Sequence, residues 1–401
     1  MERLTGKCVV LGITGGIAAY KMAYVASTLH KAGADVHVIM TKNAAQFIAP
    51  LTFETLTNNR CITDTFARDF QYDVTHISLA KAADLMLIAP ATANIIAKMA
   101  HGIADDMLST VVLAAGCKKF VAPAMNTAML ENPITQENLR TLERFGFGII
   151  PSDSGFLACG DTGSGRMPEP DVLTEYVLRE LAREKSMRGL RVTVTAGATQ
   201  ESLDPVRYLT NHSTGKMGYA IAREAMLRGA DVTLITGQTA LPDVPFVRMY
   251  PVVTAADMLC AVQETLPQTD ILIKAAAVAD YRPAIVADDK MKKSDADLSI
   301  PLERTDDILA WVAGHRTAEQ FICGFSMETQ HMLENSTEKL NRKKLDMIVA
   351  NNLKVPGAGF AVETNVVTII TADGASELPL MGKDEVAAKL LDAIAERRAK
   401  R

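Results

Sequence analysis

The feature that most constrains the fold is an alternation of short apolar runs, rich in Val and Ile, with amphipathic stretches. In the first half these runs cover 8–13, 35–40, 85–89 and 119–122. Runs of this length separated by amphipathic segments are typical of buried parallel strands joined by crossover helices. The stretch 92–115 between two of them has helical periodicity, broken at Gly102 and Asp105. The pattern predicts an α/β protein with a parallel sheet.

The second half repeats this pattern after a polar segment at 183–189. We expect strands at 190–196, 231–236, 246–250, 271–274, 321–326 and 347–350, and helices at 171–184, 218–228, 254–266 and 332–345. With 401 residues, 48% of them apolar, each half has enough apolar side chains for its own core. The sequence therefore predicts two tandem doubly wound, Rossmann-like domains, 1–188 and 189–401. Between the first domain's last strand and its last helix, residues 151–170 are rich in Gly and Pro, and we expect a long functional loop there.

Charge and cysteine usage exclude several classes of protein. The 42 Lys and Arg are scattered among 47 Asp and Glu, giving a net charge of −5, so we expect no nucleic-acid partner. Six cysteines occur without a C-x-x-C pair, which disfavours disulfides and zinc and indicates a cytoplasmic location. The most apolar stretches are interrupted by charges, so no membrane partner is expected.

Two glycine-containing segments are candidate phosphate sites. The first, 12–21 (Gly-Ile-Thr-Gly-Gly-Ile-Ala-Ala-Tyr-Lys), joins a strand to a helix, where free N–H groups suit an anion, although a tight turn with a packing role is an equal alternative. The second, 211–218 (Asn-His-Ser-Thr-Gly-Lys-Met-Gly), is not a Walker motif but places hydroxyl groups, glycines and Lys216 before a helix. A simple helix cap is its alternative interpretation.

Three single residues are candidates for chemistry. His76 can be a titrating group or a structural histidine. Asn126 follows a strand, where α/β sheets bind ligands, or else forms an Asx turn or a cap for the helix at Asn132. Cys159 stands in the glycine-rich loop, where a buried cysteine is not needed for packing, so we favour a chemical role for it. Two lysine groups, 290–293 and 339–344, can clamp a triphosphate or lie solvated on the surface.

Eight motifs in order carry a resemblance to known families. In the first half they are 12–21, 89–94 (Ala-Pro-Ala-Thr-Ala-Asn), 123–129 and 158–167, and they closely resemble the flavin-containing cysteine decarboxylases that act on phosphopantothenoylcysteine. In the second half 207–218, 274–282, 290–293 and 346–351 resemble the phosphopantothenate-cysteine ligases. The two are fused in this order in the bifunctional enzymes of bacterial coenzyme A synthesis. A departure is Leu130, which stands where many members carry an aromatic residue.

The resemblance implies cofactors and site residues for both halves. FMN is expected in the first domain, near Gly15, Gly16, Ile17, Thr41, Thr92, Ala93, Asn94 and Ala124. His76, Asn126 and Cys159 are assigned to its reaction centre, with Cys159 as proton donor. CTP is the expected cosubstrate of the second domain, with Asn211 and Lys290 as catalytic residues and Mg²⁺ (or Mn²⁺) through unknown ligands. The nucleotide positions are Lys274, Ala275, Ala276, Asp280, Lys290, Asp306, Asp307, Ile308, Leu309, Phe325, Lys339 and Lys343.

The family implies two successive reactions and an assembly. Phosphopantothenate is ligated to cysteine through an acyl-cytidylate, and the product is decarboxylated with the flavin as electron sink. A homo-oligomer, a dodecamer, is expected from the resemblance. Two other functions stay open at this point: a flavin-binding regulatory protein of the same fold, and a pyridine-nucleotide dehydrogenase suggested by the first glycine turn.

Overall fold

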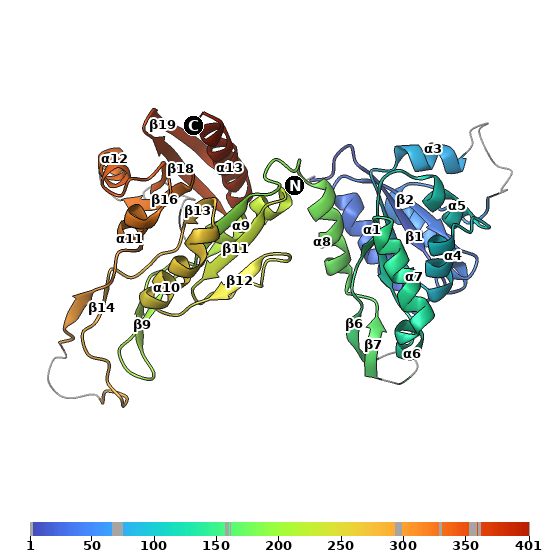
Figure 1. The fold of residues 1–401 in the computed structure, drawn as a ribbon, viewed down its shortest axis with the longest axis horizontal. Helices are drawn as coiled ribbons and strands as arrows, with labels where there is room; N and C mark the ends of the chain where they lie inside the picture. Colours follow the sequence, from blue (N-terminus) through green and yellow to red (C-terminus); the bar gives the residue numbers. More distant parts are fainter. Residues whose placement is uncertain are drawn as a thin grey trace. The chain divides into compact units, whose positions relative to one another are not determined.

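The computed structural model describes residues 3–65, 75–156, 160, 162–292, 299–328, 331–352, 359 and 362–400. The chain separates into two compact units, Met1–Arg183 and Glu184–Arg401, which are coloured blue to green and green to red in Figure 1. Each unit is a sheet with helices on both faces.

The N-terminal unit is built on five parallel strands in the order β2-β1-β3-β4-β5. They are β1 (Cys8–Ile13), β2 (Asp35–Met40), β3 (Leu85–Ala91), β4 (Lys118–Pro123) and β5 (Gly148–Ile149). Every residue of β3 is buried, which explains its unbroken apolar sequence. The predicted strand positions are confirmed, with β3 and β4 each longer than expected.

Helices cover both faces of this sheet. One face packs against α3 (Thr75–Ala82), α4 (Ala93–His101), α5 (Met107–Ala114) and α7 (Pro133–Arg144), through a core that includes Val10, Ile88 and Val121. On the other face α1 (Met22–Lys31) packs against α2 (Pro50–Thr57) and α8 (Pro170–Leu181). Short helices η1 (Ile17–Lys21), η2 (Ala44–Gln46) and α6 (Thr127–Glu131) follow strand ends.

The expected long loop at 151–170 is partly wrong. Residues on both sides of 157–161 form an antiparallel hairpin, β6 (Asp153–Phe156) and β7 (Thr162–Arg166). Apart from the exposed Phe156, its strands consist of Gly, Ser, Thr and charged residues, and most positions are exposed. They therefore lack the alternation of apolar side chains by which a strand is recognised.

The C-terminal unit has an eight-stranded sheet in the order β12-β11-β8-β13-β16-β17-β18-β19. The first six strands are parallel and were predicted: β8 (Arg191–Ala196), β11 (Asp231–Thr236), β12 (Arg248–Pro251), β13 (Ile271–Lys274), β16 (Phe321–Glu328) and β17 (Met347–Asn352). The last two, β18 (Thr364–Thr371) and β19 (Gly374–Gly382), run antiparallel and make the sheet mixed. No pattern identified them in advance; β19 is exposed at most positions.

The helices of this unit again form two layers. A core of Ile235, Leu272 and Ile322 packs against α10 (Ala255–Thr265), α11 (Ile308–His315) and α12 (Met332–Arg342). On the other face α9 (Lys216–Leu227) packs against the long α13 (Lys383–Ala399). Two small hairpins, β9 (Gln200–Ser202) with β10 (Tyr208–Thr210) and β14 (Tyr281–Pro283) with β15 (Leu302–Arg304), and η3 (Leu266–Gln268) complete it.

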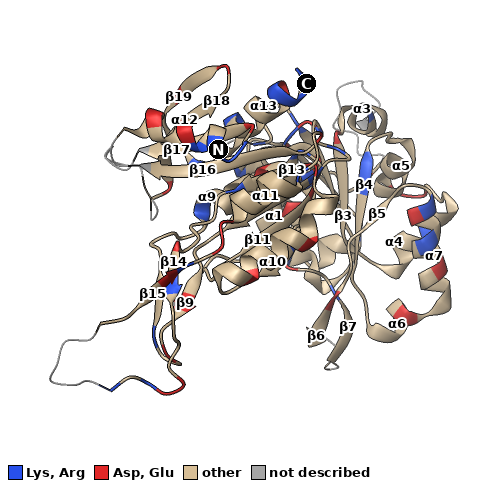
Figure 2. Ribbon diagram, turned by 60° about the vertical axis from the view of Figure 1, so that its left-hand side comes forward, with Lys and Arg blue, Asp and Glu red and all other residues tan. Residues whose placement is uncertain are grey.

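Figure 2 shows acidic and basic residues interspersed along the elements of both units. Among the described residues, no helix combines the length and the apolar character that crossing a bilayer requires.

Candidate active sites

The first candidate site is a cavity of about 460 Å³ at the carboxyl ends of β1, β2 and β3. Strands β1 and β3 are neighbours in the sheet, but β2 lies between them in sequence, so the connections leave β1 and β3 in opposite directions. Ligands of open α/β sheets bind at such a switch point. The cavity is lined by Thr14, Gly15, Met40, Thr41, Lys42, Asn43, Thr63, Asp64, Thr65, Thr92, Asn94, Ile95, Lys98, Asp105, Asp106, Met107 and Leu108.

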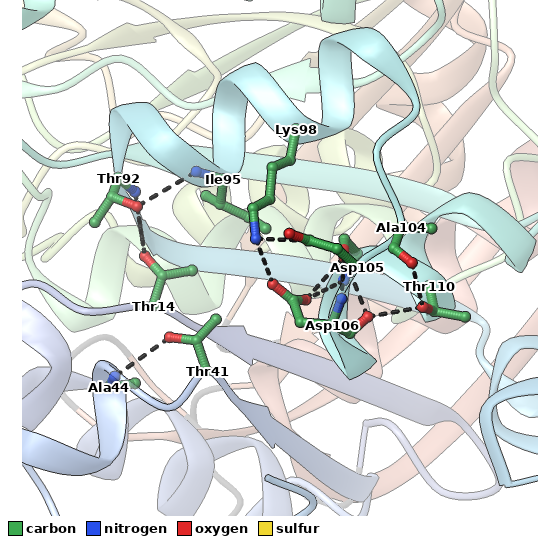
Figure 3. Close-up of polar contacts among 11 residues, drawn as sticks. Thr14, Thr41, Ala44, Thr92, Ile95, Lys98, Ala104, Asp105, Asp106 and Thr110 are labelled. Atoms are coloured by element: carbon green, nitrogen blue, oxygen red, sulfur yellow. Dashed lines mark hydrogen bonds and ion pairs between the residues drawn. The ribbon is translucent and has the colours of Figure 1, made fainter. Parts of the chain in front are cut away.

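Two threonines join the ends of β1 and β3 at this cavity. The Thr14 hydroxyl donates to the Pro90 carbonyl at 2.6 Å, and the Thr92 N–H donates back to Thr14 Oγ1 at 3.2 Å. Thr92 also caps α4, accepting from the Ile95 N–H at 3.5 Å (Figure 3). The first N–H groups of a helix have no partner within it, so the cavity has donors for an anion at the start of α4.

A charged group forms another wall of the cavity. Lys98 reaches from α4 to Asp105 at 2.6 Å and to Asp106 at 2.9 Å (Figure 3). The hydrogen bond to Asp105 raises the pKa of Lys98 against the opposing effect of burial. Burial would raise the pKa of Asp106, but the Ser109 N–H and Lys98 lower it overall. Lys98 and Asp106 are therefore ionised at neutral pH.

The structure brings four of the eight predicted FMN residues into this cavity: Gly15, Thr41, Thr92 and Asn94. The other four lie beside it without lining it. A Cβ on Gly16 would be in contact with Pro90 and Thr92, Ile17 begins η1, Ala93 begins α4, and the Ala124 N–H donates to the Ala91 carbonyl at 3.0 Å. The assignment of all eight to FMN stays a prediction.

Asn126 lies half-buried just beyond β4, and its side chain makes the local turn contact of the alternative interpretation. The helix that it caps is α6; the helix at Asn132, α7, is capped by Asn132 itself. Asn126 Oδ1 accepts from the Ala128 N–H at 2.9 Å and caps the short α6. The hairpin β6–β7 is fastened to this segment, because the Met125 N–H donates to the Gly165 carbonyl at 3.0 Å and Thr127 Oγ1 donates to the Ser164 carbonyl at 2.7 Å. The strand β7, which follows the segment containing Cys159 in the sequence, is thus hydrogen-bonded to the two residues on either side of Asn126.

The other two predicted decarboxylase residues differ in how far the structure describes them. His76 is half-buried near the start of α3 and does not line the cavity. Cys159 lies outside the described residues. The roles of both stay predictions.

The second candidate site is a cavity of about 460 Å³ in the C-terminal unit, at the carboxyl ends of β13 and β16 and the start of α9. Strands β8 and β13 form its switch point, because β11 and β12 lie on the other side of β8. The cavity is lined by Asn211, Ser213, Thr214, Gly215, Lys216, Met217, Gly218, Lys274, Ala275, Ala276, Ala277, Val278, Asp280, Phe325, Ser326, Met327, Lys339, Asn351, Gly359, Asn365 and Lys383.

Seven predicted ligase residues line this cavity: Asn211, Lys274, Ala275, Ala276, Asp280, Phe325 and Lys339. The Asn211 amide donates to the Ala277 carbonyl at 3.1 Å, and Lys339 Nζ donates to the Phe325 carbonyl at 3.3 Å. Burial and the nearby charge of Lys339 lower the pKa of Lys274 to about 8, although Asp307 and Asp280 oppose the shift. The cavity is therefore cationic at neutral pH and loses charge in mild alkali.

The remaining predicted ligase residues lie outside the lining of the cavity. Lys343 pairs with Asp307, whose side chain caps α11 by accepting from the Ala310 N–H at 2.9 Å. The side chains of Ile308 and Leu309 are buried in the core, so only their backbone can face a nucleotide. Asp306 and Lys290 are exposed, and neither lines the cavity.

Several lining residues escaped the sequence predictions. In the first cavity Lys42, Lys98, Asp105 and Asp106 were not assigned, and Asp105 was interpreted only as a helix break. In the second, Lys216 belonged to a recognised motif, but Lys383 had no local signal, because α13 brings it in from the far end of the chain.

The metal ligands remain unidentified. Among the described residues, the group with spacing suited to an ion is Cys8, Asp35 and His37. It lies at the starts of β1 and β2, the opposite end of these strands from the first cavity. Burial and then Asp35 raise the pKa of Cys8 to about 11, so the thiolate that a metal needs is disfavoured.

The family model described as Flavoprotein matches residues 1–182, and the model described as DNA/pantothenate metabolism flavoprotein C-terminal domain matches residues 187–397. The fold and the two cavities therefore belong to a flavoprotein unit fused to a pantothenate-metabolism unit. The chain is 46% identical over 397 residues to the coenzyme A biosynthesis bifunctional protein CoaBC of Bacillus subtilis, an alignment covering 98% of this chain and 97% of the relative. It is 42% identical over 397 residues to CoaBC of Escherichia coli, covering 98% of both.

Among solved structures, the C-terminal domain of CoaBC aligns with 54% of this chain and 100% of that chain, at 41% identity and a TM-score of 0.47. From its curated relatives and both family models, the chain belongs to the CoaBC family of bifunctional coenzyme A biosynthesis proteins. The predicted α/β fold and the predicted bifunctional enzyme, with a flavoprotein decarboxylase half and a phosphopantothenate-cysteine ligase half, are confirmed.

Proposed function

We propose that residues 1–188 bind FMN and decarboxylate phosphopantothenoylcysteine, and that residues 189–401 use CTP to ligate phosphopantothenate to cysteine. The observation that carries the proposal is that each unit has a cavity at its switch point, lined by residues that the family resemblance assigns to its ligand.

The donor set of the first cavity fits FMN. The N–H groups at the start of α4 and the exposed Lys42 suit the phosphate. The carboxylates of Asp105 and Asp106 are hydrogen-bond acceptors, which suits a ligand rich in hydroxyl groups. Thr14 and Thr92 fix the two strand ends relative to each other, so the site does not need to be assembled when the ligand enters.

Decarboxylation needs an electron sink, because loss of carbon dioxide otherwise leaves an unstabilised carbanion. FMN, when bound in this cavity, would supply that sink, because a flavin can take up two electrons from a substrate and give them back. We assign His76 to the proton transfer at the thiol, and Asn126 to hydrogen bonding with the substrate carboxylate. Cys159 then protonates the enethiolate that remains; a thiol with an ordinary pKa of about 8.5 is mostly protonated at neutral pH.

Ligation begins with attack of the phosphopantothenate carboxylate on the α-phosphorus of CTP, which forms the acyl-cytidylate and releases pyrophosphate. The cysteine amine then attacks the acyl carbon and releases CMP. Lys274 and Lys339 stabilise charge on the nucleotide, and Asn211 holds the acyl group. Lys290, which is exposed, and Lys343, which pairs with Asp307, also contact the nucleotide phosphates in this proposal. We propose Mg²⁺ or Mn²⁺ as the ion on the phosphates, because such ions keep few protein ligands.

Two further features belong to the proposal. A cytoplasmic location is supported by the five cysteines in the described part of the chain, all of which are free thiols. A homo-oligomer is supported by Ile17, Tyr20 and Tyr24, large side chains of η1 and α1 that are more than half exposed.

The decarboxylase assignment is tested with Cys159→Ser. We expect the isolated variant to be yellow. After addition of phosphopantothenoylcysteine it should release carbon dioxide, accumulate the unsaturated enethiol and lose its yellow colour, because without the last protonation the two electrons taken from the substrate stay on the flavin. The matched control is Cys260→Ser, an exposed thiol of α10, which should turn over normally. Full turnover to phosphopantetheine by Cys159→Ser would refute the role.

A further inference from the structure

The ligase cavity contains two pairs of lysines, of which the nucleotide assignment uses one. Lys274 and Lys339 form the first pair, and Asp307 and Asp280 are the acidic neighbours of Lys274. Lys216 and Lys383 form the second pair, and their acidic neighbour is Glu363. All four lysines line the same cavity. The cavity therefore contains two separate cationic groups, and the group formed by Lys216 and Lys383 has no assigned ligand.

Lys383 is the more constrained member of the second pair. It is the first residue of α13 and is only 6% exposed. Its Nζ donates to the Gly359 carbonyl at 3.1 Å, and its N–H donates to the Glu363 carbonyl at 2.9 Å. Burial and the charge of Lys216 lower the pKa of Lys383. A buried ammonium beside another cation costs stability, and an anionic ligand offsets that cost.

Lys216 is the first residue of α9 and follows the loop 213–215, which also lines the cavity. Gly215 caps the helix in the left-handed region, at φ +81°, and a Cβ there would lie 3.0 Å from Thr239 Cγ2. At Gly218 a Cβ would lie 2.5 Å from Ala196 Cβ, so the helix start packs directly against the end of β8. Lys216 pairs with Glu363, whose side chain is 80% exposed, and so exposed a carboxylate neutralises it weakly.

We propose that Lys216 and Lys383 bind the β- and γ-phosphates of the nucleoside triphosphate and hold the pyrophosphate as it leaves. This inference rests on the proposed ligase activity and names residues that the family assignment omits. Attack of the carboxylate oxygen forms the new bond to the α-phosphorus while the bond to the bridging oxygen of the β-phosphate breaks. The electron pair goes to pyrophosphate, so negative charge grows where two ammonium groups stabilise it.

The other phosphate in the reaction is the phosphomonoester of phosphopantothenate. It is separated from the reacting carboxylate by the whole pantothenate chain, whereas pyrophosphate is attached directly to the reacting phosphorus. Lys216 and Lys383 share their cavity with Asn211 and Lys274, which we assign to the reacting groups. Proximity to the reaction centre therefore favours the leaving group over the distant phosphomonoester.

The test compares Lys216→Gln and Lys383→Gln with Lys389→Gln, an exposed lysine on the same helix as Lys383. Loss of one charge-assisted contact should lower kcat/KM for CTP by about tenfold or more. The KM for phosphopantothenate and the decarboxylase activity of the same chain should not change. Inhibition by added pyrophosphate should weaken in both variants and stay unchanged in Lys389→Gln. Lys383→Arg, which keeps the charge, should recover part of the loss.

Direct titration of wild-type protein with inorganic pyrophosphate separates this inference from the proposed function. If wild-type protein binds pyrophosphate and Lys216→Gln does not, the site is supported, whether or not wild-type protein catalyses the ligation. Failure of wild-type protein to catalyse the ligation would count against the ligase assignment alone. If both glutamine variants bind pyrophosphate as tightly as wild-type protein does, the inference is overturned. A raised KM for phosphopantothenate with kcat/KM for CTP unchanged would also overturn it and would assign the pair to the phosphomonoester.

Discussion

Gly165→Ala should separate the two activities of the chain. Gly165 lies in β7 at φ +114°, and a Cβ there would stand 2.2 Å from the Met125 carbonyl oxygen. The unfavourable backbone conformation costs about 1–3 kcal/mol for a residue with a side chain. The clash also forces out the hydrogen bond from Met125 to the Gly165 carbonyl, worth about 1 kcal/mol. Two hydrogen bonds, worth about 1 kcal/mol each, join the exposed hairpin to the segment around Asn126. A penalty of about 2–4 kcal/mol is at least as large, so we expect the hairpin to move away from Asn126.

The assay measures both reactions of one purified variant. Decarboxylation of phosphopantothenoylcysteine should fall about 30-fold or more, since 2 kcal/mol corresponds to about that factor. CTP-dependent ligation should equal wild type, because the second unit is untouched. The control is Gly155→Ala in the paired strand β6, where a Cβ meets only the flexible Arg166 side chain at 3.3 Å. Wild-type decarboxylation by Gly165→Ala would refute the reasoning.

Three further predictions concern charge. Lys274 has a pKa of about 8, below its ordinary value, so it is charged at pH 7 and kcat/KM for CTP should fall as pH rises through about 8. Lys274→Arg should move this fall to higher pH. A wild-type kcat/KM that does not change with pH would contradict the role of Lys274. Arg228→Ala removes the ion pair with the buried Glu224 and the contact to Asp392, so calorimetry should find the C-terminal unit destabilised by about 3–5 kcal/mol. A loss under about 1 kcal/mol would show that this ion-pair network does not stabilise the unit. Asp106→Ala removes the cap of α5 and should lower the free energy of unfolding, measured with denaturant, by about 1–2 kcal/mol. Because the pKa of Asp106 is lowered, its contribution to stability should be present at neutral pH and disappear only as acid protonates the carboxylate. An equal effect of the mutation at all pH values would argue against an ionised cap.

The fold was largely predictable because its strands are buried on both faces. β3 is apolar throughout, and the parallel strands of both sheets could be recognised in the same way. The edges were not predictable from this signal. β6, β7 and β19 are exposed, so neither a continuous apolar run nor a clear alternation marks them.

In the two sites, too, some residues could be predicted from local sequence patterns and others could not. Thr92 and Asn94 follow β3 directly, and Ala275 and Ala276 follow β13, so local motifs and strand ends indicate them. Lys383 and Lys98 reach their cavities only through tertiary packing and the geometry of a helix, and nothing in the residues around them marks a ligand site. Cys159 stays outside the described residues, and its role depends on the sequence motif.

The most direct test of the account is one reaction in which purified protein receives phosphopantothenate, cysteine, CTP and Mg²⁺, while pyrophosphate and carbon dioxide are counted together. We predict a yellow protein that releases both in equal amounts and forms phosphopantetheine. Pyrophosphate release without any carbon dioxide, from protein that stays colourless after FMN is supplied, would contradict the claim that the first cavity holds a working flavin.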